Sequence, residues 1–119
     1  MSQEQKIFVV VEDSAFYAEK HKKHLQDNGA EVIILRTMGE FNEFIEKKEA
    51  SKKISAIITD GLHGDWIGVV EGAQKKNIKC IVITDNKEII EQSKYFPDVM
   101  AINKADLYEN PQKYKDLIE

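Results

Sequence analysis

The stretch IFVVVEDSAF, residues 7–16, is an apolar run that ends in two acids, Glu12 and Asp13. Three later apolar runs also end in polar residues: SAIIT is followed by Asp60, CIVI by Thr84 and VMAIN by Lys104. Short apolar runs are typical of buried strands, and the carboxyl ends of parallel strands lie at one edge of a sheet. The pattern therefore predicts that these polar side chains converge on one site.

The residue types at these strand ends suit a divalent metal and a phosphoryl group. Mg²⁺ prefers oxygen ligands and usually takes one or two carboxylates together with phosphate oxygens. Three carboxylates brought together repel one another and raise one another's pKa values unless a cation lies among them. The acids Glu12, Asp13 and Asp60 therefore predict a metal site, to which Thr84 adds a hydroxyl and Lys104 an ammonium.

Composition limits the class of protein. The chain has 119 residues, 42% of them hydrophobic and 32% charged, which is enough for one soluble domain with its own core. The net charge of −4 and lysines scattered among acids argue against nucleic acid as a partner. A single cysteine, Cys80, a polar N-terminus and no run near the ~20 apolar residues of a membrane helix predict a cytoplasmic protein with no membrane partner.

The rest of the chain alternates apolar runs with segments of helical period. Strands are expected at residues 7–11, 32–35, 55–59, 79–83 and 99–102. Helices are expected from the Asp13-Ser14 cap to about residue 28, at 38–50 and 66–76, from Asn86 to about residue 93, and at 111–118. Five such units predict a single α/β domain over residues 1–119, a doubly wound parallel sheet with helices on both faces.

The strand-end residues, in this order, resemble the functional positions of response regulator receiver domains of two-component systems. IFVVVEDSAF is similar to the first strand and acidic pair of that family, and IITDGLHGDWIG to its phosphoacceptor strand and loop. Thr84 and Lys104 match the family's switch hydroxyl and lysine, so the resemblance covers essentially the whole chain. It implies a flavodoxin-like five-stranded sheet in the order 2-1-3-4-5.

The resemblance also implies a chemistry. Asp60 would accept a phosphoryl group from a histidine kinase or a histidine phosphotransfer protein, assisted by Thr84 and Lys104. Mg²⁺ would be held by the carboxylates of Glu12, Asp13 and Asp60 and by the backbone carbonyl of Leu62. Such a protein is a phosphoacceptor that assists its own phosphorylation and dephosphorylation, and not an enzyme in the usual sense. We expect a stand-alone receiver that signals by contact with a downstream protein.

The chain departs from the usual pattern of the family at Gly64, where a proline is usual, and at three positions that bear on switching. Ala101 stands where an aromatic residue is common, Asp85 where a small residue follows the switch hydroxyl, and Ala105 where a proline follows the lysine. Ala101 removes the aromatic that usually moves during switching, and Asp85 is expected to place an acid near the phosphoryl group. These departures favour an alternative function, a pseudo-receiver that acts as a phosphate-independent protein-interaction module.

Each site residue also has an ordinary structural interpretation. Asp13 with Ser14 can simply cap a helix, and Asp60 before Gly61 can be a turn residue. The segment 103–106 matches the N-K-x-D guanine-recognition motif, but no phosphate loop of the form G-x-x-x-x-G-K-[ST] accompanies it. The combined pattern therefore favours a phosphoacceptor site over a nucleotide site.

Overall fold

The structure, a computed structural model, describes residues 6–47, 54–61 and 64–118. It contains a five-stranded sheet in the order β2-β1-β3-β4-β5, and every pair of neighbouring strands is parallel. The strands are β1 Ile7–Val11, β2 Glu31–Leu35, β3 Ile54–Thr59, β4 Cys80–Thr84 and β5 Val99–Asn103. The predicted flavodoxin-like fold and strand order are confirmed.

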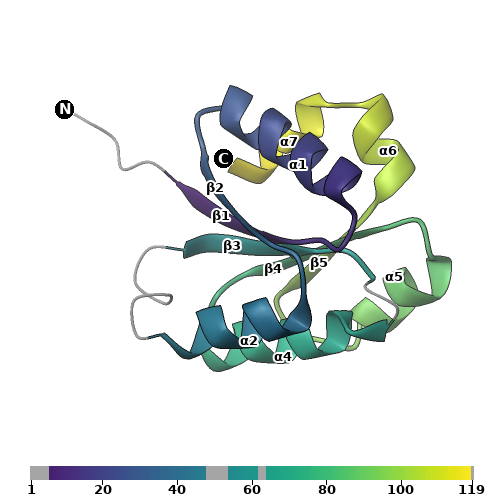
Figure 1. Cartoon of the computed structure of the whole chain (residues 1–119). Helices are drawn as coiled ribbons and strands as arrows, with labels where there is room; N and C mark the ends of the chain where they lie inside the picture. Colours follow the sequence, from purple (N-terminus) through teal and green to yellow (C-terminus); the bar gives the residue numbers. More distant parts are fainter. Residues whose placement is uncertain (1–5, 48–53, 62–63, 119) are drawn as a thin grey trace.

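Helices cover both faces of the sheet (Figure 1). One face carries α1 Ala15–Asp27, α6 Lys104–Glu109 and α7 Gln112–Ile118, and the other carries α2 Met38–Glu46, α4 Trp66–Lys75 and α5 Lys87–Ser93. Val9 and Val11 of β1 pack with α2 and α4, whereas Phe8 and Val10 pack with α1, α6 and α7. Because successive side chains of a strand point to opposite faces, a strand buried on both faces is an unbroken apolar run.

The structure refines the predicted helix boundaries and adds one helix. α2 ends at Glu46, short of the predicted residue 50, and residues 48–53 lie outside the described part of the chain. Ser14, whose hydroxyl accepts from the Tyr17 N–H, is the N-cap of α1, and Asp13 is not. Helix α6 was not predicted, although the side chain of Asn103 caps it by accepting from the Asp106 N–H at 3.1 Å. Its cap lies inside the segment that matched the guanine motif.

None of the helices in the described ranges is long and apolar enough to cross a membrane.

The packing of α4 on α2 leaves no room for a side chain at Gly72. A Cβ at this position would lie 2.8 and 2.9 Å from ring atoms of Phe41, which is fully buried. We expect Gly72→Ala to lower the free energy of unfolding by about 1–3 kcal/mol, because overpacking outweighs the helix preference of alanine. Gly39→Ala in α2 is the matched control, since its Cβ would meet nothing nearer than 3.7 Å. Urea unfolding of both variants measures the two changes in stability. Equal losses of stability in Gly72→Ala and Gly39→Ala would contradict the close packing at Gly72.

Candidate functional site

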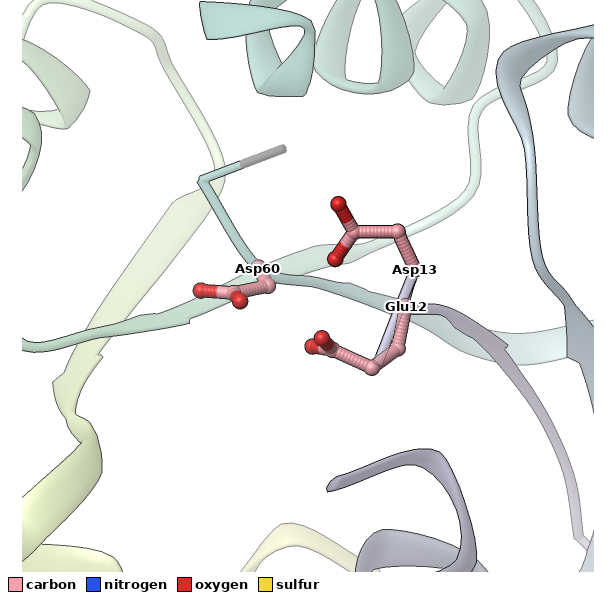
Figure 2. A group of neighbouring side chains, drawn as sticks. All are labelled: Glu12, Asp13 and Asp60. Atoms are coloured by element: carbon pink, nitrogen blue, oxygen red, sulfur yellow. The ribbon is translucent and has the colours of Figure 1, made fainter. Parts of the chain in front are cut away.

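Three carboxylates lie together at the carboxyl ends of β1 and β3 (Figure 2). Glu12, Asp13 and Asp60 each offer one oxygen, and these oxygens lie within 4.8 Å of one another. Val11 pairs with Thr59 in the parallel register of β1 and β3, so the residues that follow the two strands lie side by side. The predicted convergence of the three acids is therefore observed. Oxygen ligands at this spacing suit a hard divalent cation.

The ammonium of Lys104 lies against Asp60. Lys104 is the first residue of α6, directly after β5, and only 7% of it is exposed. Its Nζ is 3.0 Å from Oδ2 of Asp60, while Oδ1 of Asp60 accepts from the Gly61 N–H at 2.7 Å. Both oxygens of Asp60 therefore have a donor partner, and one of these partners is a nearly buried cation.

Thr84 ends β4 and lines the same cavity as the acids. This cavity has a volume of about 580 Å³. Its other lining residues include Tyr17, Trp66, Asn86 and Gln92. Oγ1 of Thr84 accepts from the Asn86 N–H at 3.1 Å, which leaves its O–H hydrogen able to turn into the cavity. The fourth expected metal ligand, the carbonyl of Leu62, lies outside the described residues.

Glu12 is the most deeply buried acid of the cluster. It is 1% exposed, and its Oε1 accepts from the Ser14 N–H at 3.2 Å. Its Oε2 is buried, with no hydrogen-bond partner among the residues described. Burial, and then the negative charge of Asp60, raise the pKa of Glu12 to about 7. A buried carboxylate oxygen without a donor, next to two more carboxylates, fits a site for a divalent cation.

Arg36, the single arginine of the sequence, holds the turn that carries the acidic pair. Its guanidinium donates to the carbonyl of Glu12 at 3.1 Å through Nε and to the carbonyl of Asp13 at 2.8 Å through Nη2. Arg36 follows β2, which pairs with β1 so that Leu35 lies opposite Val11. Sequence reasoning missed this residue, although its place after a neighbouring strand at the same sheet edge was a usable signal.

Loss of this guanidinium is expected to weaken cation binding. We expect Arg36→Gln to lower the free energy of unfolding by about 1 kcal/mol and to weaken Mg²⁺ binding several-fold, because the acidic turn loses two charge-assisted hydrogen bonds. Mg²⁺ titration followed by the fluorescence of Trp66, which lines the cavity, measures the change. Lys94→Gln is the control, since it removes an equal charge from an exposed ion pair with Glu91. Equal Mg²⁺ affinities in the two variants would contradict the role of Arg36.

The unusual residues Asp85 and Ala105 form one hydrogen bond. Oδ1 of Asp85 accepts from the Ala105 N–H at 3.0 Å, and Asp85 is exposed and does not line the cavity. In this structure the Asp85 carboxylate therefore bonds to the start of α6, outside the lining of the cavity. Proline at position 105 would have no N–H to donate, so the two departures fit one another. Together they tether the start of α6, where Lys104 lies.

Ala101 lies in β5, one of the two edge strands of the sheet, and is half-buried. Two aromatic residues, Tyr95 and Phe96, precede this strand in the sequence. The ring of Phe96 packs edge-on against Trp66, with centroids 5.7 Å apart, whereas Tyr95 is 87% exposed. Of the two rings, that of Phe96 thus packs against a side chain that lines the cavity.

Sequence comparison alone does not assign a family. No family model matches the chain. A curated relative, neuropeptide-like 2 of Drosophila melanogaster, is 41% identical over 54 residues, which are 44% of this chain and 58% of that protein. The chain thus matches less than two thirds of that relative, over a segment too short to hold the five-stranded sheet.

Solved structures share the fold over nearly the whole chain. A response regulator receiver domain protein from Bacillus halodurans superposes with a TM-score of 0.76 at 16% identity, over 98% of each chain. A response regulator of Thermotoga maritima in complex with Mg²⁺ and BeF superposes with a TM-score of 0.70 at 24% identity, over 95% of this chain and 99% of that chain. A de novo designed Rossmann 2x3 protein superposes with a TM-score of 0.67 at 17% identity, over 95% of this chain and 85% of that one. Because a designed protein shares this fold, the fold alone does not specify a function. The chain has the fold of the response regulator receiver domains.

Proposed function

We propose that the protein is a cytoplasmic, phosphorylatable receiver of a two-component signalling relay, with Asp60 as the phosphoacceptor. The observation that carries this proposal is the contact of 3.0 Å between the Lys104 ammonium and Asp60, within a cluster of three carboxylates. A cation and an acidic cluster around one carboxylate supply what phosphoryl transfer asks of a protein, which is positioning and charge stabilisation. The receiver fold adds support for this reaction class.

The residues present fit Mg²⁺, which one of the structural neighbours was solved with. Glu12, Asp13 and Asp60 would hold the ion, and the carbonyl of Leu62 is the proposed fourth protein ligand. When bound, Mg²⁺ neutralises negative charge on the phosphoryl oxygens. The orphaned Oε2 of Glu12 is the feature of this chain that fits the ion most directly.

The chain's own groups have distinct roles in the proposed reaction. A carboxylate oxygen of Asp60 forms a bond to phosphorus while the bond between phosphorus and the donor breaks, and the leaving group of the donor keeps the electron pair. Lys104 moves its N–H donors from Asp60 to the phosphoryl oxygens, and Thr84 donates its hydroxyl hydrogen to one of them. The protein is thus a phosphoacceptor that assists its own phosphorylation and dephosphorylation. Its donor is a histidine kinase or a histidine phosphotransfer protein, and its output is contact with a downstream protein.

Intact mass spectrometry tests this function. The native protein, incubated with a small phosphodonor and Mg²⁺, is expected to gain one phosphoryl group, and chelation of Mg²⁺ is expected to prevent the gain. Asp60→Asn is expected to gain none, whereas Asp65→Asn, which alters an exposed aspartate near the start of α4, is expected to behave as native. An unmodified native protein would overturn the proposal and leave the pseudo-receiver, a phosphate-independent interaction module.

A further inference from the structure

An aromatic ring from α1 lies against the lysine of the site. The Nζ of Lys104 is 4.0 Å from the centroid of the Tyr17 ring, on the face of that ring. Tyr17 is half-buried and lines the same cavity as Asp60 and Thr84. The Lys104 ammonium therefore lies against both the Asp60 carboxylate and the Tyr17 ring.

A second ring supports Tyr17 from behind. Tyr108 of α6 lies parallel to Tyr17, with centroids 5.7 Å apart and an angle of 7° between the rings. The hydroxyl of Tyr108 is buried and has no hydrogen-bond partner within the described ranges, so ring packing holds this residue in place. The Nζ of Lys20 lies over the Tyr108 ring, 4.6 Å from its centroid. The Tyr17 ring is thus backed by packed neighbours on α1 and α6.

We propose that Tyr17 is a positioning residue for Lys104, a proposal that rests on the proposed function of Asp60. An aromatic face attracts an ammonium without carrying a net charge. A carboxylate at the same place would also hold the lysine, but it would repel an incoming phosphoryl group. The ring also takes none of the N–H donors of Lys104 in an ordinary hydrogen bond, so these donors stay available for phosphoryl oxygens.

Two variants at position 17 separate the ring from the rest of the side chain. Tyr17→Leu removes the ring, and we expect phosphorylation of Asp60 by a small phosphodonor to slow by about 5- to 30-fold. Tyr17→Phe keeps the ring and is expected to restore nearly the native rate. Tyr95→Leu is the matched control, because it makes the same change at a ring that is 87% exposed. A native rate in Tyr17→Leu, or a loss in Tyr17→Phe equal to that in Tyr17→Leu, would overturn the proposal.

A spectroscopic measurement tests the contact independently of phosphorylation. In the protein labelled with ¹³C-lysine, the methylene protons next to the Lys104 ammonium are expected to resonate upfield, because they lie near an aromatic face. The upfield shift should persist in Tyr17→Phe and Tyr95→Leu and disappear in Tyr17→Leu. Its persistence in Tyr17→Leu would overturn the positioning role. If the native protein takes no phosphoryl group but the shift depends on Tyr17, the proposed function fails and the positioning of Lys104 stands.

Discussion

Lys104→Met is expected to slow the phosphorylation of Asp60 by about 10²- to 10³-fold, the usual cost of removing one group that stabilises developing charge in a closed site. Lys104 Nζ is 3.0 Å from Oδ2 of Asp60, and the lysine side chain is only 9% exposed. Loss of this ammonium leaves the Asp60 carboxylate without its ion-pair partner, while the buried acid Glu12 still lies next to it. We therefore also expect the free energy of unfolding at pH 8, without Mg²⁺, to fall on the order of 3 kcal/mol.

The matched control for this variant is Lys113→Met. Lys113 pairs with Asp106 at 3.3 Å, and both side chains are well exposed, so its loss should cost less than about 1 kcal/mol. Phosphorylation rates come from intact mass over time, and stabilities from urea unfolding. A Lys104→Met protein that is phosphorylated at the native rate would contradict the role of the ammonium.

Glu12→Gln is expected to stabilise the metal-free protein at pH 8 by as much as about 3 kcal/mol and to leave it nearly unchanged at pH 4.5. The pKa of Glu12 rises from an ordinary value of 4.5 to about 7 on folding, because of burial and the charge of Asp60. At a pH between these two pKa values, Glu12 has lost its proton in the unfolded chain and has kept it in the folded protein. The free energy of unfolding of the native protein therefore falls as the pH rises from about 4.5 to 7, because folding opposes the ionisation of Glu12. Glutamine does not ionise, so this loss of stability is absent from the variant.

Buried His21 makes an opposite contribution, so the comparison needs the difference between variant and native. Burial, and then the charge of Lys104, lower the pKa of His21 to about 4, so its contribution to stability rises with pH up to about 6.5. Urea unfolding of both proteins at several pH values from 4.5 to 8 isolates the contribution of Glu12. Glu19→Gln on the exposed face of α1 is the control and should show no such change. Parallel stability curves for Glu12→Gln and native would contradict the raised pKa.

The sheet and the convergence of the site were predictable because both follow from where apolar runs end. Ile7–Val11 of β1 and residues 80–83 of β4 are buried on both faces of the sheet, so their sequences are unbroken apolar runs. In a parallel sheet the next residue of each such run lies at the same edge, which places Asp60 beside Glu12 and Lys104 beside Asp60. The alternation of apolar runs with helical segments, together with the common direction of parallel strands, was sufficient to predict the sheet and the position of the site.

The contacts that position the site were not predictable in the same way, because they depend on side chains that cross between elements. Arg36 holds the carbonyls of Glu12 and Asp13 from the end of β2, and Tyr17 contacts Lys104 from α1. The carboxylate of Asp85 accepts a hydrogen bond from the Ala105 N–H of α6, a contact that its place after Thr84 did not predict. No spacing rule specifies these contacts, since each depends on the rotamer of a long or exposed side chain.

The most direct test of the central claim is to locate the phosphoryl group chemically. Borohydride reduces an aspartyl phosphate to a primary alcohol, which converts the aspartate to homoserine. After treatment with a small phosphodonor and Mg²⁺, reduction and digestion, peptide mass spectrometry is expected to find homoserine at position 60. Homoserine at another aspartate, such as Asp13, or aspartate unchanged at position 60 in a protein treated under the same conditions, would contradict the assignment of Asp60 as the phosphoacceptor.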